Sequence, residues 1–305
     1  MCEPQSPVVA IVGPTGVGKS ALALELAERL GAEIVNADSR QVYRYLDIGT
    51  AKPTTAERAR VAHHVFDVVD PDESFDCARY RERALAAIAD IQRRGRRVLV
   101  VGGTGLYVKT LHYGLAPGPP RDVALRTQLE AEEDAEPGSL HRRLSEIDVV
   151  IAARLHPHDR VRLIRALEVH QLTGRPLSAW HAEHGFRAEV VPMTVVGLSL
   201  DRAYLRTRLV VRCRAMAERG LLDEIRSLWA RGYGRDLPIL QTIGYRELGA
   251  VVAGDSTLDA ALAAMTTATC RLAKRQLTWF RGDATVRWFD AKRDLPAAFD
   301  AVCAL

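Results

Sequence analysis

Short apolar runs alternate with longer amphipathic stretches along the first third of the chain. The apolar runs predict strands at 8–12, 33–36, 63–71 and 97–101, and the stretches between them predict helices at 20–30 and 77–94. Strands that alternate with helices are typical of βαβ units, in which neighbouring strands run parallel. This region is therefore predicted to form an α/β domain with a parallel sheet between layers of helices.

The pattern changes at residues 114–122, where three prolines and two glycines fall within nine residues. Such a cluster marks a boundary. From there to about residue 192 only helical patterns occur, and strand character returns at 193–201 before further helices. We therefore expect a core domain made of 1–116 and 193–305, interrupted by an all-helical insertion domain at 117–192.

Composition limits the class of protein. The chain has 305 residues, 48% hydrophobic residues and a net charge of +4, which by itself does not indicate a nucleic-acid partner. Five cysteines are scattered without the spacing of a metal site, and no apolar run is long enough to span a membrane. The first residues do not resemble a signal peptide. We expect a cytoplasmic protein with no membrane association, and a monomer.

One motif between the first strand and the first helix carries clear chemistry. It fits G-x-x-x-x-G-K-[ST] in full and comprises Gly13, Pro14, Thr15, Gly16, Val17, Gly18, Lys19 and Ser20. In such a loop, backbone N–H groups and the helix N-terminus surround a phosphate, and the lysine adds a positive charge. The serine hydroxyl is suited to Mg²⁺, so we expect Mg²⁺ at Ser20. The motif predicts phosphate binding but does not identify the phosphate compound.

A nucleotide hydrolase would place an acidic residue after an apolar strand to position the metal ion. The 97–101 strand ends instead in two glycines, although Asp67 and Asp70 follow another apolar run and remain candidates. No guanine-reading N-K-x-D segment is present. A small-molecule kinase therefore stays open as an alternative, whereas a GTPase does not fit.

Further segments join the phosphate loop in a recognisable order: NADSRQVY, DIGTAKP, GGTGLY, HPHDRVRLIRALEV, QTIGYREL and RLAKRQLTWFRG. Together they make nearly the whole chain resemble the bacterial tRNA dimethylallyltransferases (tRNA isopentenyltransferases, the IPP transferase family). The resemblance implies a P-loop NTPase-like α/β fold and two substrates, dimethylallyl diphosphate and the anticodon stem-loop of tRNA. The loop would hold the diphosphate as a leaving group. The N6 amine of the adenosine immediately 3′ of the anticodon would attack the allylic carbon.

The resemblance also assigns roles to particular residues. Asp38, just after the second strand, would be the general base, and Thr104 would contact the reacting groups. Arg208 and Arg212, four residues apart on a predicted helix, are candidates for a diphosphate clamp. From the residues alone, Asp38 could also form a turn, Thr104 could cap a helix, and the two arginines could simply face solvent.

Basic and aromatic residues near the C-terminus have the composition of a surface that binds loop RNA. The same composition is compatible with a C-terminal helix in which Trp279, Phe280 or both are core residues. The resemblance places the following residues against tRNA: Asp38, Ser39, Arg40, Gln41, Thr104, Arg126, Val161, Arg162, Leu163, Ile164, Arg165, Gln241, Thr242, Ile243, Gly244, Tyr245, Arg246, Lys274, Arg275, Gln276, Leu277, Thr278, Trp279, Phe280 and Arg281.

Two further alternatives remain at this point. One is a prenyltransferase acting on free adenine nucleotides, against which the helical insertion and the basic C-terminal segment argue. The other is an RNA-binding regulator that senses a phosphate ligand.

Overall fold

The computed structural model describes residues 7–186 and 188–304, which divide into two compact units. The larger unit comprises the described residues up to His112 and from Val191 onward, and the smaller one spans Tyr113–Val190. The sequence placed the insertion at 117–192, so the division in the structure lies four residues earlier at one end and two earlier at the other.

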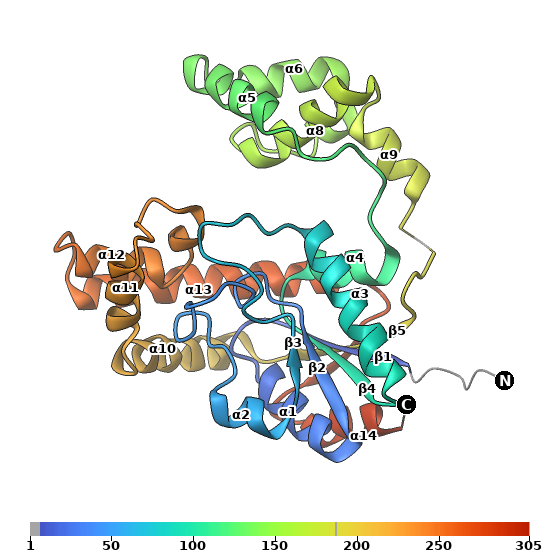
Figure 1. The fold of residues 1–305 in the computed structure, drawn as a ribbon, viewed down its shortest axis with the longest axis vertical. Coiled ribbons are helices and arrows are strands. Elements are labelled where there is room, and N and C mark those ends of the chain that lie inside the picture. Colours follow the sequence, from blue (N-terminus) through green and yellow to red (C-terminus); the bar gives the residue numbers. More distant parts are fainter. Residues whose placement is uncertain (1–6, 187, 305) are drawn as a thin grey trace. The chain divides into compact units, whose positions relative to one another are not determined.

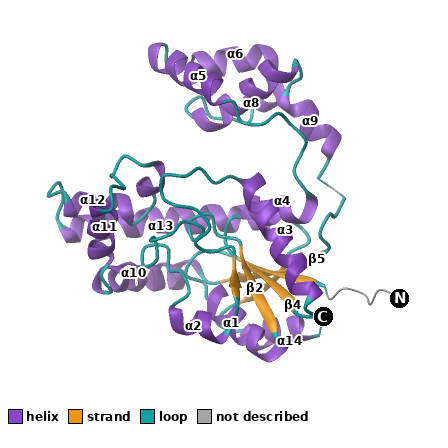
Figure 2. Ribbon diagram, in the orientation of Figure 1, coloured by secondary structure: helices purple, strands orange, loops and turns teal. Residues whose placement is uncertain are grey.

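A six-stranded sheet forms the centre of the larger unit (Figures 1 and 2). Its order is β3-β2-β4-β1-β5-β6, and every pairing is parallel. The strands are β1 (Val8–Val12), β2 (Ala32–Asn36), β3 (His63–His64), β4 (Arg97–Val101), β5 (Met193–Ser199) and β6 (Arg287–Asp290). The predicted P-loop-like α/β fold is thereby confirmed.

Helices cover both faces of this sheet, and the central strand β1 is accordingly apolar and buried at every position rather than at alternate ones. On β1, Val8, Ala10 and Val12 belong to one buried cluster, while Val9 and Ile11 belong to another. The elements around the sheet are α1 (Lys19–Leu30), α2 (Thr55–Arg60), α3 (Cys77–Arg93), α4 (Gly105–Tyr113), α10 (Arg202–Glu218), α11 (Leu221–Ala230), the short 3₁₀ helix η1 (Pro238–Gln241), α12 (Tyr245–Val252), α13 (Leu258–Arg281) and α14 (Leu295–Cys303).

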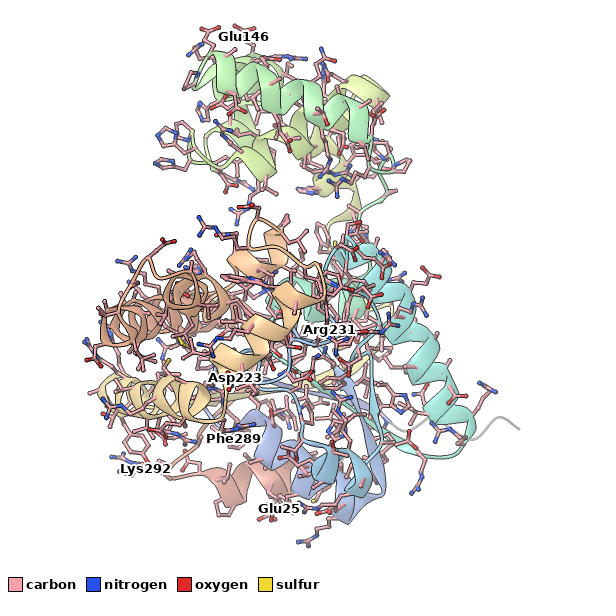
Figure 3. All side chains as sticks on the ribbon, turned by 60° about the vertical axis from the view of Figure 1, so that its left-hand side comes forward. Glu25, Glu146, Asp223, Arg231, Phe289 and Lys292 are labelled. Carbon is pink, nitrogen blue, oxygen red and sulfur yellow. The ribbon has the colours of Figure 1, made fainter. Side chains whose placement is uncertain are left out.

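The smaller unit is entirely helical in its described residues and has its own core. It contains α5 (Val123–Ala135), α6 (Ser139–Ile147), α7 (Val149–Ala152), α8 (Arg160–Thr173) and α9 (Leu177–His184). Leu129, Leu140 and Leu163 are fully buried there. Charged side chains such as Glu146 on α6, and Glu25 on α1 of the larger unit, are exposed at the surface (Figure 3).

The two ends of the insertion lie next to each other in the larger unit. The backbone N–H of Val191 donates to the carbonyl oxygen of His112 at 3.2 Å. The chain therefore leaves the core after α4 and returns at almost the same point before β5.

Two strand predictions need correction. The 63–71 run is a strand only at His63–His64, because Val65 and Asp67 adopt positive φ angles of 63° and 55° that interrupt an extended chain. The edge strand β6 was not expected. It is four residues long and only partly buried, so its apolar pattern is weak. No helix among the described residues is long and apolar enough to cross a bilayer.

Candidate functional site

The phosphate-binding motif forms the turn from β1 into α1, as expected. Gly13, Gly16 and Gly18 have φ angles of 139°, 79° and 115°, which residues with a side chain rarely adopt. A Cβ atom at Gly13 would also overlap the carbonyl oxygen of Leu198 on β5. The glycines therefore allow this loop to curl tightly against the sheet.

Lys19 lies within the curl of the loop. Its ammonium group donates hydrogen bonds to the carbonyl oxygens of Gly13 and Pro14, each at 2.9 Å. Burial lowers the pKa of Lys19 to about 8, although the charge of Asp38 acts in the opposite direction. The ammonium is thus held in place with few compensating charges and is suited to an incoming anion.

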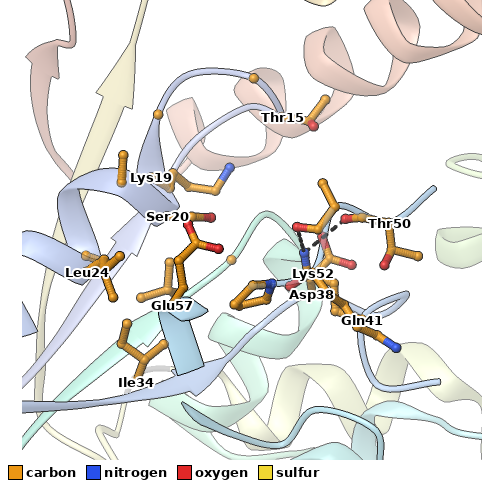
Figure 4. Close-up of a pocket in the computed structure, with 18 of the residues that line it drawn as sticks. Thr15, Lys19, Ser20, Leu24, Ile34, Asp38, Gln41, Thr50, Lys52 and Glu57 are labelled. Atoms are coloured by element: carbon orange, nitrogen blue, oxygen red, sulfur yellow. Dashed lines mark hydrogen bonds between the residues drawn. The ribbon is translucent and has the colours of Figure 1, made fainter. Parts of the chain in front are cut away.

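A cavity of about 390 Å³ opens in front of this loop (Figure 4). Arg208 and Arg212 of α10 line it together with Lys19 and Ser20, so the structure brings both predicted clamp residues to the loop. Burial lowers the pKa of Arg212. Within the described residues, no carboxylate lies at ion-pair distance from Lys19, Arg208 or Arg212. We refer to this set of three cations and the loop as the phosphate cradle.

Asp38 follows β2 at the carboxyl edge of the sheet and is held by its neighbours. The buried Asn36 side chain accepts from the Asp38 N–H at 2.9 Å and donates to the Asp38 carbonyl at 3.1 Å. One carboxylate oxygen of Asp38 accepts from the N–H of Arg40 at 2.8 Å. Asp38 therefore does form a turn, and its second carboxylate oxygen is left to face the cavity, which this residue lines.

Thr104, after the Gly-Gly turn of β4, lies beside Asp38. Its hydroxyl oxygen accepts a hydrogen bond from the N–H of Ser39 at 2.9 Å. The bond fixes the position of the hydroxyl and leaves its hydrogen available to another acceptor. The two predicted catalytic residues, 66 positions apart in sequence, are thus neighbours through one backbone group.

A second cavity, of about 280 Å³, adjoins the first. Thr15, Asp38, Thr50, Arg212 and Gln276 line both. Thr104 and the 241–243 segment contribute to the second cavity only. Asp38 therefore lies where a cavity lined by candidate phosphate-binding groups meets a cavity lined by candidate RNA-binding residues.

Glu224 of α11 organises this region, and sequence reasoning did not identify it. Its carboxylate accepts the backbone N–H groups of Asp47, Ile48 and Gly49 at 3.0, 2.7 and 3.2 Å, and the hydroxyl of Tyr245 at 2.6 Å. These bonds fix the segment that carries Thr50 into both cavities. Since Glu224 is 175 residues from Gly49, no local pattern could have revealed it.

The two acidic residues that the sequence offered as metal ligands, Asp67 and Asp70, form ion pairs with basic side chains. Asp67 forms ion pairs with Lys52 and Arg58, and Asp70 pairs with Arg44 at 3.1 Å. Among the described residues, no group of three or more His, Cys, Asp or Glu side chains is placed to hold a metal ion. Ser20, exposed on the first turn of α1, is the predicted metal ligand that faces the cradle.

The predicted RNA-binding stretches divide into exposed and buried side chains. On α13, Lys274, Arg275 and Arg281 are exposed and Trp279 is 47% exposed, whereas Phe280 is only 2% exposed. Elsewhere, the side chains of Leu163, Ile164 and Tyr245 lie in hydrophobic cores. These buried side chains support the surface rather than present themselves to a ligand.

In the helical unit, two of the predicted RNA-binding arginines converge on one carboxylate. Arg126 donates two hydrogen bonds to the fully buried Glu168, at 2.7 and 2.8 Å, and Arg165 donates a third at 2.6 Å. Although burial acts to raise it, these bonds hold the pKa of Glu168 at about 2. By contrast, the Arg162 side chain is 69% exposed, with Asp159 3.3 Å away.

Comparisons with known proteins give one consistent result. A family model described as IPP transferase matches residues 41–283. A tRNA dimethylallyltransferase of Geobacter metallireducens is 50% identical over 301 residues, covering 98% of this chain and 96% of that protein. One from Geobacter sulfurreducens is 47% identical over 296 residues, covering 97% of this chain and 94% of that protein.

Solved structures agree with these matches. The tRNA isopentenylpyrophosphate transferase of Bacillus halodurans is 40% identical with a TM-score of 0.70, and the match covers 98% of this chain and 96% of that one. A eukaryotic dimethylallyltransferase described as acting on tRNA is 30% identical with a TM-score of 0.79, covering 97% and 78% of the two chains. The similarity therefore extends over both units.

Proposed function

Because this chain belongs to the IPP transferase family, whose curated relatives are tRNA dimethylallyltransferases, we propose that it transfers a dimethylallyl group to tRNA. The donor is dimethylallyl diphosphate, and the acceptor is the N6 amine of the adenosine immediately 3′ of the anticodon. The observation that carries this proposal is the position of Asp38 in the wall shared by the two cavities.

The phosphate cradle binds the diphosphate of the donor. Its loop N–H groups and the ammonium of Lys19 neutralise the oxygens, and Arg212 and Arg208 approach from α10. These groups stabilise the negative charge that grows on the diphosphate as it leaves. The phosphate compound is thus a leaving group rather than a source of a transferred phosphoryl group.

Mg²⁺ fits this arrangement through the Ser20 hydroxyl and the diphosphate oxygens. With few protein ligands nearby, the ion would keep water in its remaining positions, as Mg²⁺ prefers at phosphate sites. When bound, it supplies further charge neutralisation to the departing diphosphate. We propose that the reaction proceeds without ATP.

Asp38 and Thr104 act on the acceptor. The free carboxylate oxygen of Asp38 accepts a hydrogen bond from the N6 amine and takes its proton as the bond from nitrogen to the allylic carbon forms. The bond from that carbon to the diphosphate oxygen breaks, and its electron pair leaves with diphosphate. The Thr104 hydroxyl, held by Ser39, is placed to donate to a reacting group.

The acceptor adenine must leave its stack to reach Asp38, so we propose that it is flipped into the second cavity. The exposed cations of α13, Lys274, Arg275 and Arg281, supply contacts to RNA phosphates, and Trp279 supplies a stacking surface. The exposed Arg162 contributes a contact from the helical unit. We propose a cytoplasmic enzyme that acts as a monomer.

A mass measurement tests the reaction directly. The protein is mixed with Mg²⁺, dimethylallyl diphosphate and an anticodon stem-loop RNA without ATP, and the mass of the RNA is measured by mass spectrometry. We expect a gain of one C₅H₈ unit. A stem-loop with purine in place of the acceptor adenine lacks the amine and should gain nothing. An unchanged RNA, or transfer of labelled γ-phosphate from ATP to a small molecule, would contradict the proposal.

A further inference from the structure

Gln276 connects three elements of the larger unit that are far apart in sequence. It lies on α13, and its side-chain carbonyl accepts the backbone N–H of Thr15 in the phosphate loop at 2.8 Å. Its side-chain NH₂ donates to the carbonyl oxygen of Gly103, in the turn after β4, at 3.1 Å. One amide thus joins the phosphate loop, the Gly-Gly turn and α13.

The Gly-Gly turn is shaped to receive α13. A Cβ atom at Gly103 would overlap the Gln276 amide, and one at Gly105 would overlap the indole ring of Trp279. Gln276 and Trp279 are three residues apart and therefore lie on the same face of the helix. This face is docked against the turn, so a shift of α13 would move the turn or break its contacts.

Both loops held by Gln276 lead to reacting groups. Thr15 belongs to the phosphate cradle. Thr104 follows Gly103 and holds the N–H of Ser39, next to Asp38. Gln276 itself lines both cavities. The position of this one side chain therefore affects the geometry on the diphosphate side and on the acceptor side.

The residues that precede Gln276 on α13 face a different environment. Lys274 and Arg275 are exposed, and they carry the proposed RNA contacts. RNA bound to these cations would restrict the motion of α13 and hence of Gln276. A loop that is already ordered loses less entropy when it closes around a ligand.

We propose that Gln276 is a positioning residue that couples the two substrates: RNA bound on α13 orders the phosphate loop through Gln276 and tightens binding of the diphosphate. This inference rests on the proposed RNA-binding role of α13. The coupling is reciprocal, so diphosphate also tightens binding of the RNA.

Inorganic diphosphate is a suitable probe because it allows no reaction. Its Kd in Mg²⁺ is measured by calorimetry without RNA and with a saturating anticodon stem-loop. For the unmodified protein we expect RNA to tighten diphosphate binding by at least about fivefold, the lower end of typical couplings. Gln276→Met fills the same space without either hydrogen bond and should bring the ratio of the two Kd values to about one.

Two further variants keep the result interpretable. Lys274→Ala should weaken RNA binding, but at saturating RNA its ratio should match that of the unmodified protein. If Gln276→Met melts at a lower temperature, Gln276→Asn replaces it, since the shorter amide cannot reach Thr15 and Gly103 together. A ratio near one in the unmodified protein, or an unchanged ratio in the Gln276 variant, would overturn the coupling.

The proposed function is judged separately by the gain of a C₅H₈ unit. If the protein prenylates RNA but RNA does not change its affinity for diphosphate, only the proposed role of Gln276 is contradicted. A stem-loop that does not bind at all overturns the coupling together with the RNA-binding role of α13.

Discussion

The cations of the phosphate cradle and the arginines of the helical unit show two opposite ways of treating a partly buried positive charge. In the helical unit, Arg126 and Arg165 are neutralised by the buried carboxylate of Glu168. In the cradle, Lys19 and Arg212 lie close together, and burial lowers the pKa of each. The former arginines are paired within the protein, whereas we propose that the latter cations bind the diphosphate.

The difference indicates which basic residues in this sequence are available to a ligand. A buried cation without a carboxylate partner costs folding free energy, and an anionic ligand can recover that cost. A cation that already has a buried partner gains little from a phosphate. Five predictions test this contrast, beginning with the largest expected effect.

Replacing Asp38, whose charge acts on both Lys19 and Arg212, should have the largest effect on turnover. In Asp38→Asn the amide oxygen can still accept the Arg40 N–H, so the turn is preserved, but the general base is lost. We expect turnover to fall by roughly 10²–10⁴-fold while RNA affinity is retained. Single-turnover kinetics and RNA binding measure the two quantities. A fall of less than tenfold would remove Asp38 from this role.

Arg126→Ala should destabilise the helical unit. The change leaves Glu168, whose side chain is fully buried, with fewer hydrogen bonds, and breaking such a pair costs about 3 kcal/mol or more. Denaturant unfolding measures the loss. The affinity for diphosphate should stay unchanged. In the matched variant Arg126→Lys, which keeps the charge but not the paired hydrogen bonds, the loss should be smaller. Equal losses would show that a positive charge without the paired hydrogen bonds gives Glu168 no stabilisation.

Arg212→Ala should have the opposite signature. We expect diphosphate binding to weaken by about 10–100-fold, which corresponds to about 1.4–2.8 kcal/mol, the usual range for a charge-assisted contact. The free energy of unfolding should stay constant or rise, because a partly buried cation with no carboxylate at ion-pair distance is removed. Arg208→Ala, at a more exposed position, is the control and should weaken binding less. A destabilised Arg212→Ala protein with normal diphosphate affinity would reverse our assignment.

Diphosphate affinity should depend on pH through Lys19. Its pKa of about 8 means that the ammonium is charged below pH 8 and loses its proton as the pH rises. We therefore expect affinity to fall between pH 7.5 and pH 9.5 by up to about tenfold per pH unit. Lys19→Met should bind diphosphate more weakly at pH 7, and its affinity should lack this pH dependence.

The lowered pKa of Lys19 also affects the stability of the unliganded protein, where the pH dependence has the opposite sign. It lies below the value of 10.5 for a free lysine, so Lys19 makes folding more favourable as pH rises from 8 to 10.5.

The smallest effect concerns the salt dependence of RNA binding. Lys274→Ala should make the plot of the logarithm of the RNA association constant against the logarithm of salt concentration less steep, by about one unit of slope. This is the value for one lost phosphate contact. Arg165→Ala should reduce the slope by less, because Glu168 already neutralises part of that charge. Filter binding over a range of salt concentrations gives both slopes. Equal slopes for the two variants would mean that Arg165 contacts phosphate despite its partner.

Local patterns predicted the parts of this molecule that depend on neighbours in sequence. The phosphate loop needs only a strand, glycines, a lysine and a helix in succession, and all are where the sequence placed them. Resemblance to a family added Asp38 and Thr104, which the structure brings together through Ser39.

Long-range contacts could not be predicted in this way. Gln276 bonds to residues 261 and 173 positions away, and Glu224 to a segment more than 170 positions away. The sequence alone also does not tell a paired arginine from an unpaired one. Arg126 pairs with Glu168, 42 positions away, whereas no described carboxylate lies at ion-pair distance from Arg212, and only the fold shows this difference.

The contact between His112 and Val191 makes the helical unit separable by design. Since the chain exits and re-enters the core at adjacent residues, a short glycine-rich splice across that gap would leave the sheet and its site intact. The same junction would accept a helical module excised from a relative. The RNA contacts proposed for the helical unit could then be varied while the proposed catalytic groups and the α13 contacts stay unchanged.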